Sequence, residues 1–251
     1  MTTSRFSGDT DLTVSSGASL VFTPANFSVP QLVTIAAAED ADTVNDSAVF
    51  RVSAPGIATY DLTVNGIDTP PPPLSVVSRK IHGAAGTLDI NLPLTGSPGV
   101  ECRSGGATGD YHLVITFANA VTVNGTVQAR VTSGVGDVGT GGVPNGGAVS
   151  VNGAVVTVPL TNIANAQTIG VTLFDVHQGA NAGDMAVQMS VLVGDTTGNR
   201  TVNSSDISET KAVSGSAVTS GNFRNDVTVN GVINTADISL VKSKSGTALP
   251  P

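Results

Sequence analysis

The residues of this chain best suited to chemistry are two sets of oxygen-bearing side chains near its carboxyl end. The stretch DTTGNRTVNSSDIS begins at Asp195, and DVTVNGVINTADIS begins at Asp226. A 12-residue cation loop takes oxygen ligands from positions 1, 3, 5, 7, 9 and 12, and position 7 supplies a main-chain carbonyl. In the first copy these positions are Asp195, Thr197, Asn199, Thr201, Asn203 and Asp206. In the second copy they are Asp226, Thr228, Asn230, Val232, Asn234 and Asp237. The sequence therefore predicts two calcium sites.

Helix signals follow each loop. Residues 204–213 and 235–244 begin with Ser or Thr and carry an Asp in the first turn, and each segment is followed by a Gly. Hydroxyl and acidic side chains favour the start of a helix, and Gly often follows its end. The unit is predicted to be a loop and one short helix, present twice. Position 8 of each loop, Val202 or Ile233, is expected to pair the two loops through a short β contact.

A simpler interpretation of each loop is ordinary turn chemistry, because Asp, Asn and Gly are the usual turn residues. Duplication of the same six-position pattern with the same following helix favours the ion-binding interpretation.

Residues 194–249 resemble a type I dockerin, the paired calcium-loop module that ends many secreted polysaccharide-degrading enzymes and docks onto cohesin domains. The duplicated pattern D-x-x-x-N-x-x-V/I-N-S/T-x-D-I carries the resemblance. Thr at position 3 and Asn at position 5 depart from it, leaving two carboxylates in each loop, so we expect weaker calcium binding than in a typical dockerin. Arg200 stands at position 6, where Gly231 keeps the usual turn residue. The first loop is therefore expected to be the weaker site.

The resemblance also implies a partner surface. Positions 10 and 11 of the two loops would face a cohesin-type or other β-sandwich protein, which could be this chain's own middle domain. These residues are Ser204, Ser205, Thr235 and Ala236. Because the apolar content of this region is small, we expect it to fold only with calcium.

Upstream, the chain is predicted to be mainly β. Residues 1–68 indicate a partial β-sandwich that resembles Calx-β-like repeats, 69–73 a proline-rich linker, and 74–193 a second sandwich that is cohesin-like or carbohydrate-binding-like. The expected architecture is two immunoglobulin-like or jelly-roll sandwiches followed by a small helical module, 194–251, with two EF-hand-type calcium loops. Short alternating segments divided by Gly, Asn and Pro carry this prediction, and four successive prolines form a stiff spacer.

Composition excludes several classes of function. The net charge of −8 argues against nucleic-acid binding, and no apolar run is long enough to span a membrane. Cys102 is the only cysteine, so no intrachain disulfide forms, and a small buried hydrophobe is its simplest role. The first residues lack the apolar core of a signal peptide. The chain is either cytosolic or part of a longer exported protein, and we favour a secreted or cell-surface protein with its export signal in a longer precursor.

No catalytic constellation emerges from the sequence. His82, His112 and His177 are dispersed, and the acidic turn with Glu39, Asp40, Asp42 and Asp46 is more simply a solvated turn than a cation site. We expect a non-catalytic region of a bacterial multi-modular protein that uses its calcium module for attachment or assembly. Two alternatives stay open. One is the accessory tail of an extracellular polysaccharide-degrading glycoside hydrolase, where an extracellular polysaccharide is a further partner. The other is a structural cell-surface or fibre-forming protein built of β-sandwich modules.

Overall fold

The computed structural model describes residues 1–38, 45–139, 146–179 and 181–250. It divides into two compact units, Met1–Pro71 with His177–Gly183, and Pro72–Val176 with Asp184–Pro251. The boundary near Pro71 falls inside the proline run that the sequence marks as a linker. The predicted C-terminal module and most of the predicted middle sandwich belong to the second unit, while His177–Gly183 of that sandwich falls in the first.

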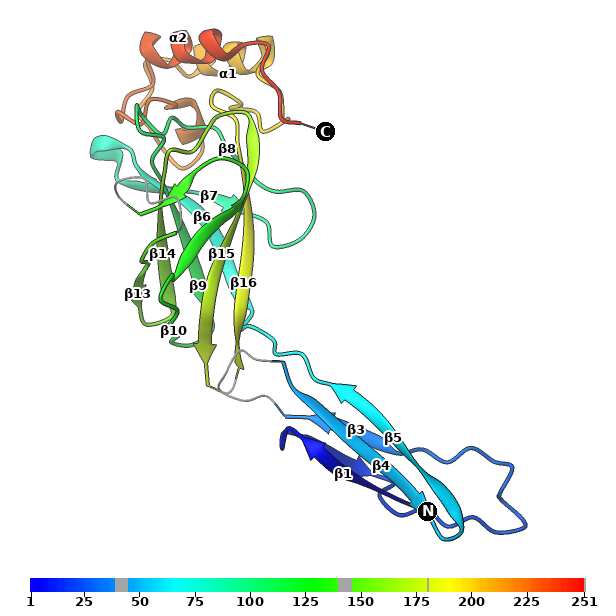
Figure 1. The fold of residues 1–251 in the computed structure, drawn as a ribbon. Helices are drawn as coiled ribbons and strands as arrows, with labels where there is room; N and C mark the ends of the chain where they lie inside the picture. Colours follow the sequence, from blue (N-terminus) through cyan, green and yellow to red (C-terminus); the bar gives the residue numbers. More distant parts are fainter. Residues whose placement is uncertain (39–44, 140–145, 180, 251) are drawn as a thin grey trace. The chain divides into compact units, whose positions relative to one another are not determined.

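The first unit is a small pair of sheets (Figure 1). One sheet has the order β1-β4-β5, and the other pairs β2 with β3. The strands are β1 (Thr2–Gly8), β2 (Leu12–Ser16), β3 (Thr34–Ala37), β4 (Ser47–Ala54) and β5 (Ile57–Asn65). Its buried core consists of Leu12, Ala48 and Phe50. Most of β5 is exposed, so this unit buries little apolar surface of its own.

The second unit is built on two larger sheets (Figure 1). One has the order β12-β14-β9-β6-β7, with β13 beside β14, and the other has the order β10-β15-β16-β8, with β11 beside β15. The strands of the first sheet are β6 (Pro73–Ile81), β7 (Thr87–Leu92), β9 (Tyr111–Phe117), β12 (Asp137–Val138), β13 (Ser150–Asn152) and β14 (Val155–Thr161). Those of the second are β8 (Val100–Glu101), β10 (Thr122–Val123), β11 (Ala129–Ser133), β15 (Gln167–Gln178) and β16 (Asn181–Val191).

Alternation of apolar side chains builds the core of this sandwich. Successive residues of a strand point to opposite faces of the sheet, so every second residue faces the core. Along β9 the buried inward positions are Tyr111, Leu113, Ile115 and Phe117. Along β16 they are Met185, Val187, Met189 and Val191. The mainly β fold predicted from the sequence is confirmed.

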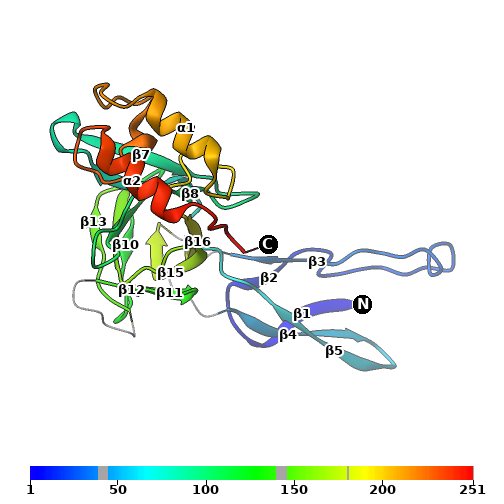
Figure 2. The ribbon, with the colours of Figure 1, turned by 90° about the horizontal axis from the view of Figure 1, so that it is seen from above.

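Two short helices complete the second unit, α1 (Ser204–Ala212) and α2 (Thr235–Lys244), and they pack against each other (Figure 2). A 3-10 turn, η2 (Phe223–Asn225), lies between them in the chain, and another, η1 (Gly83–Ala85), follows β6. Both helices begin at the residues that the sequence indicates. None of the helices in the described part of the chain is long and apolar enough to cross a membrane.

Candidate functional site

The first loop is closed by hydrogen bonds to two buried carboxylates. Asp195 accepts the main-chain N–H of Asn199 at 3.0 Å through Oδ1 and that of Arg200 at 2.9 Å through Oδ2. At the other end of the loop, Oδ1 of Asp206 accepts the N–H of Thr197 at 3.0 Å and its hydroxyl at 2.9 Å. Positions 1 and 12 of the predicted loop therefore organise its backbone.

The second loop repeats this network. Asp226 accepts the N–H groups of Asn230 at 3.1 Å and Gly231 at 2.9 Å. Oδ1 of Asp237 accepts the N–H of Thr228 at 3.0 Å and its hydroxyl at 2.8 Å. The duplication in sequence is thus a duplication of these four hydrogen bonds in the structure.

Position 9 of each loop caps the following helix. The side chain of Asn203 accepts the N–H of Ser205 at 2.8 Å, and Oδ2 of Asp206 accepts the N–H of Asn203 at 2.9 Å. Asn234 and Asp237 form the same capping box at the start of α2. A capping box satisfies N–H groups that a helix leaves without partners at its first turn. The residues at predicted ligand positions 9 and 12 therefore also form the helix cap.

The oxygens gathered in each loop are of the kind that calcium prefers. In loop one the Thr197 hydroxyl lies 3.4 Å from Oδ1 of Asp195 and 2.9 Å from Oδ1 of Asp206, between the two carboxylates. Asn199 at position 5 already accepts the N–H and the hydroxyl of Thr201 at 3.0 and 2.8 Å. The residues fit an oxygen-ligated cation of modest affinity, because each loop brings two carboxylates.

Backbone strain is shared between the loops in a crossed pattern. Arg200, at position 6, adopts a φ of 71°, as the sequence argument requires, and Gly231 adopts 85° at the same position of loop two. At position 4 the roles reverse, because Gly198 stands in loop one and Val229, with a φ of 59°, in loop two. Positive φ is costlier for a β-branched residue than for most others. Each loop therefore carries one strained residue.

The expected β contact between the two loops at position 8 is wrong. Val202 instead donates to the carbonyl of Thr247 at 2.9 Å and accepts from Gly246 at 2.8 Å. Ile233 accepts from Gly215 at 2.8 Å. Each loop thus pairs with the segment that follows the helix of the other copy. Two copies that interlock in this way hold both chain segments after the helices in place.

A buried ion pair lies in the sandwich, beneath loop two. Arg103 and Glu101 are both fully buried, and their side chains are joined by bonds of 2.9 and 2.7 Å. The Ser78 hydroxyl also donates to Glu101. Burial opposes ionisation of Glu101, but Arg103 and Ser78 together hold its pKa below the usual value. Because both members of this buried pair have several hydrogen-bond partners, removing either side chain is expected to destabilise the fold strongly.

His82 links that pair to loop two. A guanidinium can only donate, so the 3.0 Å contact from Nη1 of Arg103 fixes Nε2 of His82 as the acceptor. Nδ1 of His82 then carries the proton and donates to Oδ2 of Asp226 at 2.8 Å. Burial works against the Asp226 carboxylate, yet the bonds from His82 and from Gly231 hold its pKa below the ordinary value. Position 1 of loop two is thereby joined to the centre of the sandwich.

The side chain of Arg224, in η2, holds loop one by binding the main chain of the loop. Its guanidinium donates to the carbonyls of Thr196 and Asp195, both at 2.9 Å, and to the carbonyl of Val100 at 3.2 Å. Within the described part of the chain, no side chain donates to the Asp195 carboxylate as His82 does to Asp226, apart from the long contact of Thr197 within the loop. Burial accordingly raises the pKa of Asp195, against the effect of the loop N–H groups. The two copies are anchored to the sandwich by different chemistry.

The sandwich and the helical module share an apolar cluster. Val100 and Leu192 of the sandwich pack with four buried residues that follow them in the chain. These four are Val202, Val227, Val241 and Leu249. A core this small would be incomplete without the sandwich side chains, so the module is built onto its neighbour.

Sequence reasoning missed His82, Glu101 and Arg103 as parts of this site. His82 was one of three dispersed histidines, and Glu101 and Arg103 merely flank Cys102. Cys102 is fully buried, and burial raises the pKa of its thiol to about 12. A Glu and an Arg on either side of the single cysteine, at the end of β8, were the available signal, because such charges are buried only when they are paired.

The residues expected to face a partner all lie on the surface of the module. Ser204 and Ser205 open α1, and Thr235 and Ala236 open α2. All four are exposed. The module contacts the sandwich through the apolar cluster described above and through Phe223, Arg224 and Asp226 of η2 and loop two.

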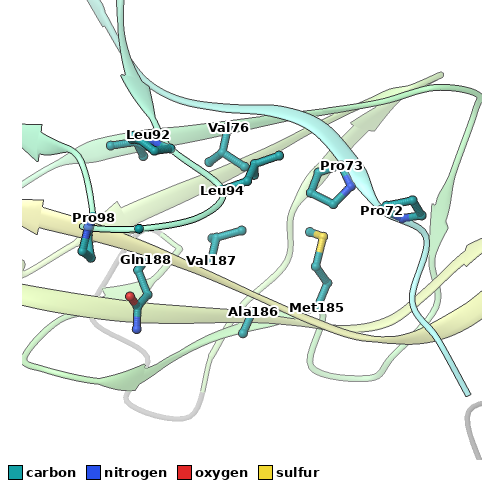
Figure 3. A pocket seen from close by; sticks show the side chains of 12 residues that line it. Pro72, Pro73, Val76, Leu92, Leu94, Pro98, Met185, Ala186, Val187 and Gln188 are labelled. Carbon is teal, nitrogen blue, oxygen red and sulfur yellow. The ribbon is translucent and has the colours of Figure 1, made fainter. Parts of the chain in front are cut away.

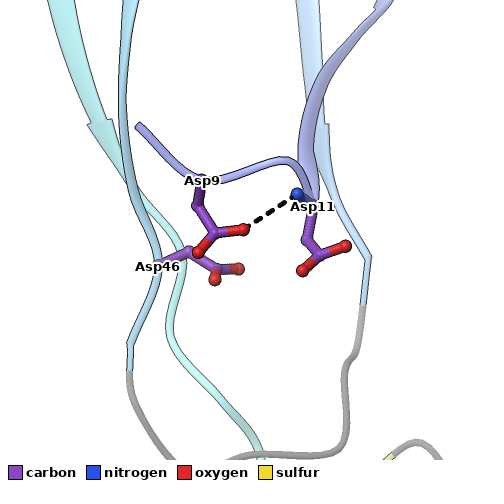
Figure 4. Close-up of side chains that lie close together, drawn as sticks. All are labelled: Asp9, Asp11 and Asp46. Atoms are coloured by element: carbon purple, nitrogen blue, oxygen red, sulfur yellow. Dashed lines mark hydrogen bonds between the residues drawn. The ribbon is translucent and has the colours of Figure 1, made fainter. Parts of the chain in front are cut away.

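An acidic cluster in the first unit is a separate cation candidate (Figure 4). Oxygens of Asp9, Asp11 and Asp46 lie within 4.8 Å of one another. Oδ1 of Asp9 accepts the N–H of Asp11 at 3.0 Å, and this bond lowers the pKa of Asp9. Of the acidic turn named from the sequence, Asp46 is in this cluster. The other members lie outside the described residues: Glu39, Asp40 and Asp42.

A cleft of about 480 Å³ opens at the edge of the sandwich (Figure 3). Its walls are mainly apolar and come from the start of β6, the segment after β7, and β16. Val76, Leu92, Met185 and Val187 represent its lining, and none of the lining residues is titratable. This cleft has no group for acid–base chemistry.

No protein-family model, curated protein or solved structure matches this chain. The geometry of the loops and their anchors therefore carries the functional conclusion.

Proposed function

We propose that this chain is a non-catalytic part of an exported multi-modular protein, and that its C-terminal repeat is a calcium-binding attachment module. The observation that carries the proposal is the repeated loop geometry. In each copy the carboxylates of positions 1 and 12 organise one loop around a Thr hydroxyl, Thr197 or Thr228, with identical donors. Turn chemistry alone does not require two distant carboxylates to be brought together twice.

Calcium would be held in each loop by the oxygens at positions 1, 3, 5, 7, 9 and 12. A bound ion supplies positive charge that neutralises the two buried carboxylates of a loop. The chain's own part is to position these oxygens: loop N–H groups orient Asp195 and Asp226, and the capping boxes orient Asp206 and Asp237.

The attachment surface is proposed to be the exposed start of the two helices. Ser204, Ser205, Thr235 and Ala236 follow directly on a loop ligand, so a bound ion would stiffen the backbone that presents them. Their small side chains leave the first turn accessible to a flat partner. A cohesin-type or other β-sandwich protein fits this surface, while η2 and loop two hold the module on its own sandwich.

Calorimetric titration of the full chain with calcium tests the proposal. We expect Asp206→Ala and Asp237→Ala each to remove one binding event, while Ser208→Ala, in the exposed part of α1, leaves both. The same titration monitored by hydrogen exchange should show new protection in 195–206 and 226–237. No heat and no change in protection at millimolar calcium would contradict the proposal.

A structural cell-surface or fibre-forming role is a second candidate, favoured by the first unit. On β5, Ile57, Tyr60 and Leu62 are 70%, 66% and 45% exposed. Exposed apolar residues on a strand favour pairing with another sheet. Sedimentation of the full chain with and without Tyr60→Ser and Leu62→Ser separates the two. Loss of self-association in the double variant supports assembly, whereas a monomer in both contradicts it.

A further inference from the structure

A second cavity of about 480 Å³ lies between the sandwich and loop two. Unlike the apolar cleft at the sandwich edge, it contains charged and hydroxyl-bearing side chains. Lys80 and His112 contribute nitrogen, Asp110 contributes a carboxylate, and Ser104 and Thr87 contribute hydroxyls. Cavities with an apolar body and a few convergent polar groups are the usual form of a small-ligand site.

Lys80 is the group that distinguishes this cavity. Its ammonium donates to the carbonyl of Asp110 at 2.7 Å and lies 4.2 Å from the centre of the Tyr111 ring. Within the described residues, no carboxylate lies at ion-pair distance from Lys80. An ammonium has three N–H donors, so two remain for a ligand. Burial lowers the pKa of Lys80 to about 8, and the nearby charge of Glu101 opposes this shift.

The neighbouring charges are already engaged. Arg79 forms a two-bond pair with Asp89, at 2.9 and 2.6 Å. The Asp110 carboxylate accepts the Thr108 hydroxyl at 2.7 Å. This carboxylate still borders the cavity, so it attracts hydroxyl donors of a ligand and repels a second negative charge. A single negative charge placed at Lys80 suits these surroundings better than a dianion.

We propose that this cavity binds a small hydroxylated monocarboxylate, such as a sugar acid or a hydroxy acid. The carboxylate would take the free donors of Lys80. Ligand hydroxyls would meet the hydroxyls of Ser104 and Thr87 and the carboxylate of Asp110. The apolar part of the wall, formed by Val114 and Val229, would receive the carbon skeleton.

The position of Val229 is a second observation for a site here. Val229 holds a φ of 59° while it lines the cavity, and two residues before it the carbonyl of Val227 accepts the N–H of Ser104 at 2.7 Å. Strained backbone of this kind persists only where the surroundings enforce it, and it gathers at ligand sites. Loop two thus contributes Val229 to the wall of the cavity.

Calorimetry and amide NMR of the full chain in chelator, with D-glucuronate as the ligand, test the proposal separately from calcium binding. D-glucose is the neutral match, and inorganic phosphate is the more highly charged anion. We expect glucuronate to bind and to shift the amides of Gly105 and Gly106, with glucose and phosphate binding about tenfold more weakly. Lys80→Gln should weaken glucuronate binding about tenfold, and Lys242→Gln, on exposed α2, should not change it.

Three results would overturn the site. They are equal binding of glucose and glucuronate, amide shifts confined to other parts of the chain, and undiminished binding by a Lys80→Gln protein that circular dichroism shows to be folded. The NMR measurement needs no variant, so a Lys80→Gln protein that fails to fold leaves the proposal falsifiable. None of these outcomes bears on the proposal that the two loops bind calcium.

Discussion

Loop one and loop two have the same ligand pattern, the same internal hydrogen bonds and the same capping boxes, yet the sandwich holds them differently. Loop two is held by a side chain: the imidazole of His82 donates to Asp226 at 2.8 Å. Loop one is held by its main chain, through bonds of 2.9 Å from Arg224 to the carbonyls of Asp195 and Thr196. The two copies therefore have similar sequences but different interactions with the groups that hold them to the sandwich.

In loop two a side chain outside the loop donates to the Asp226 carboxylate, whereas among the described residues no side chain outside loop one donates to the Asp195 carboxylate. The pKa of Asp226 is lowered by its bond to His82, despite burial, and burial raises that of Asp195. At Asp195 burial therefore outweighs the loop N–H groups and the charge of Arg224. In loop two the ion would share its carboxylate with an imidazole.

Removal of His82 should have the largest effect. His82→Ala leaves the buried groups of Arg103 and Asp226 without their partner, and loss of one member of such a network costs about 3 kcal/mol of the free energy of unfolding. Urea unfolding measures the loss, and hydrogen exchange should show it in loop two before loop one. His112→Ala, which removes an exposed imidazole, is the control and should cost about 0.5 kcal/mol or less. Equal effects of the two variants would remove His82 from the anchor.

Arg224→Met should reverse the pattern. It removes three main-chain bonds from a half-buried guanidinium but keeps an apolar stem, so we expect a loss of about 2 kcal/mol. Hydrogen-exchange protection should fall first in loop one. Lys211→Met, on exposed α1, is the matched control. If loop two loses protection first in the Arg224 variant, the separate anchoring of the two loops is refuted.

The pH dependence of stability provides a test on the side of loop two. Lys80 lines a cavity that Val229 of loop two also borders. Burial lowers the pKa of Lys80 to about 8 from its ordinary 10.5, although nearby Glu101 and Asp110 favour the charged form and Arg103 opposes it. Between these values the unfolded chain binds more protons at this site, so stability rises with pH there and the cost of the charge is complete below pH 8.

Lys80→Met should therefore stabilise the protein at pH 7, by about 1–2 kcal/mol after allowance for partial exposure, and the gain should vanish towards pH 10.5. Thermal unfolding of both proteins across this range measures the difference. A gain that is constant with pH would show that packing, and not charge, is responsible.

The order of calcium affinity should show the smallest effect. In the sequence, Gly231 in loop two against Arg200 in loop one predicts that loop two binds calcium more tightly. The structure adds two features that act against loop two, the positive φ of Val229 and the bond from His82 to Asp226. We therefore expect loop one to bind more tightly by about three- to tenfold, roughly 1 kcal/mol. Calorimetry of Asp195→Ala and Asp226→Ala should show the larger loss of affinity in Asp195→Ala. A larger loss in Asp226→Ala would restore the order that the glycine argument gives.

The local features of the module were predictable from its sequence. Helix starts at Ser204 and Thr235 follow from Asn caps with Asp three residues later, and the positive φ of Arg200 follows from its place at position 6. Alternation of apolar residues likewise predicted strands for the sandwich. Each of these depends on neighbours a few residues apart, and the chemistry of such neighbours can be inferred from the sequence.

What holds the module was decided by the tertiary structure alone. His82 and Asp226 meet across 144 residues, and Cys102 and Arg224 across 122. The register and burial of the strands that bring them together are fixed only once the two sheets have packed. No local periodicity in the sequence therefore predicts the contact. The same packing placed Val202 against the segment after α2 instead of against Ile233. Sequence determined what each loop is, and the sandwich determined how each is held, because buried polar groups must find partners wherever the fold brings one within reach.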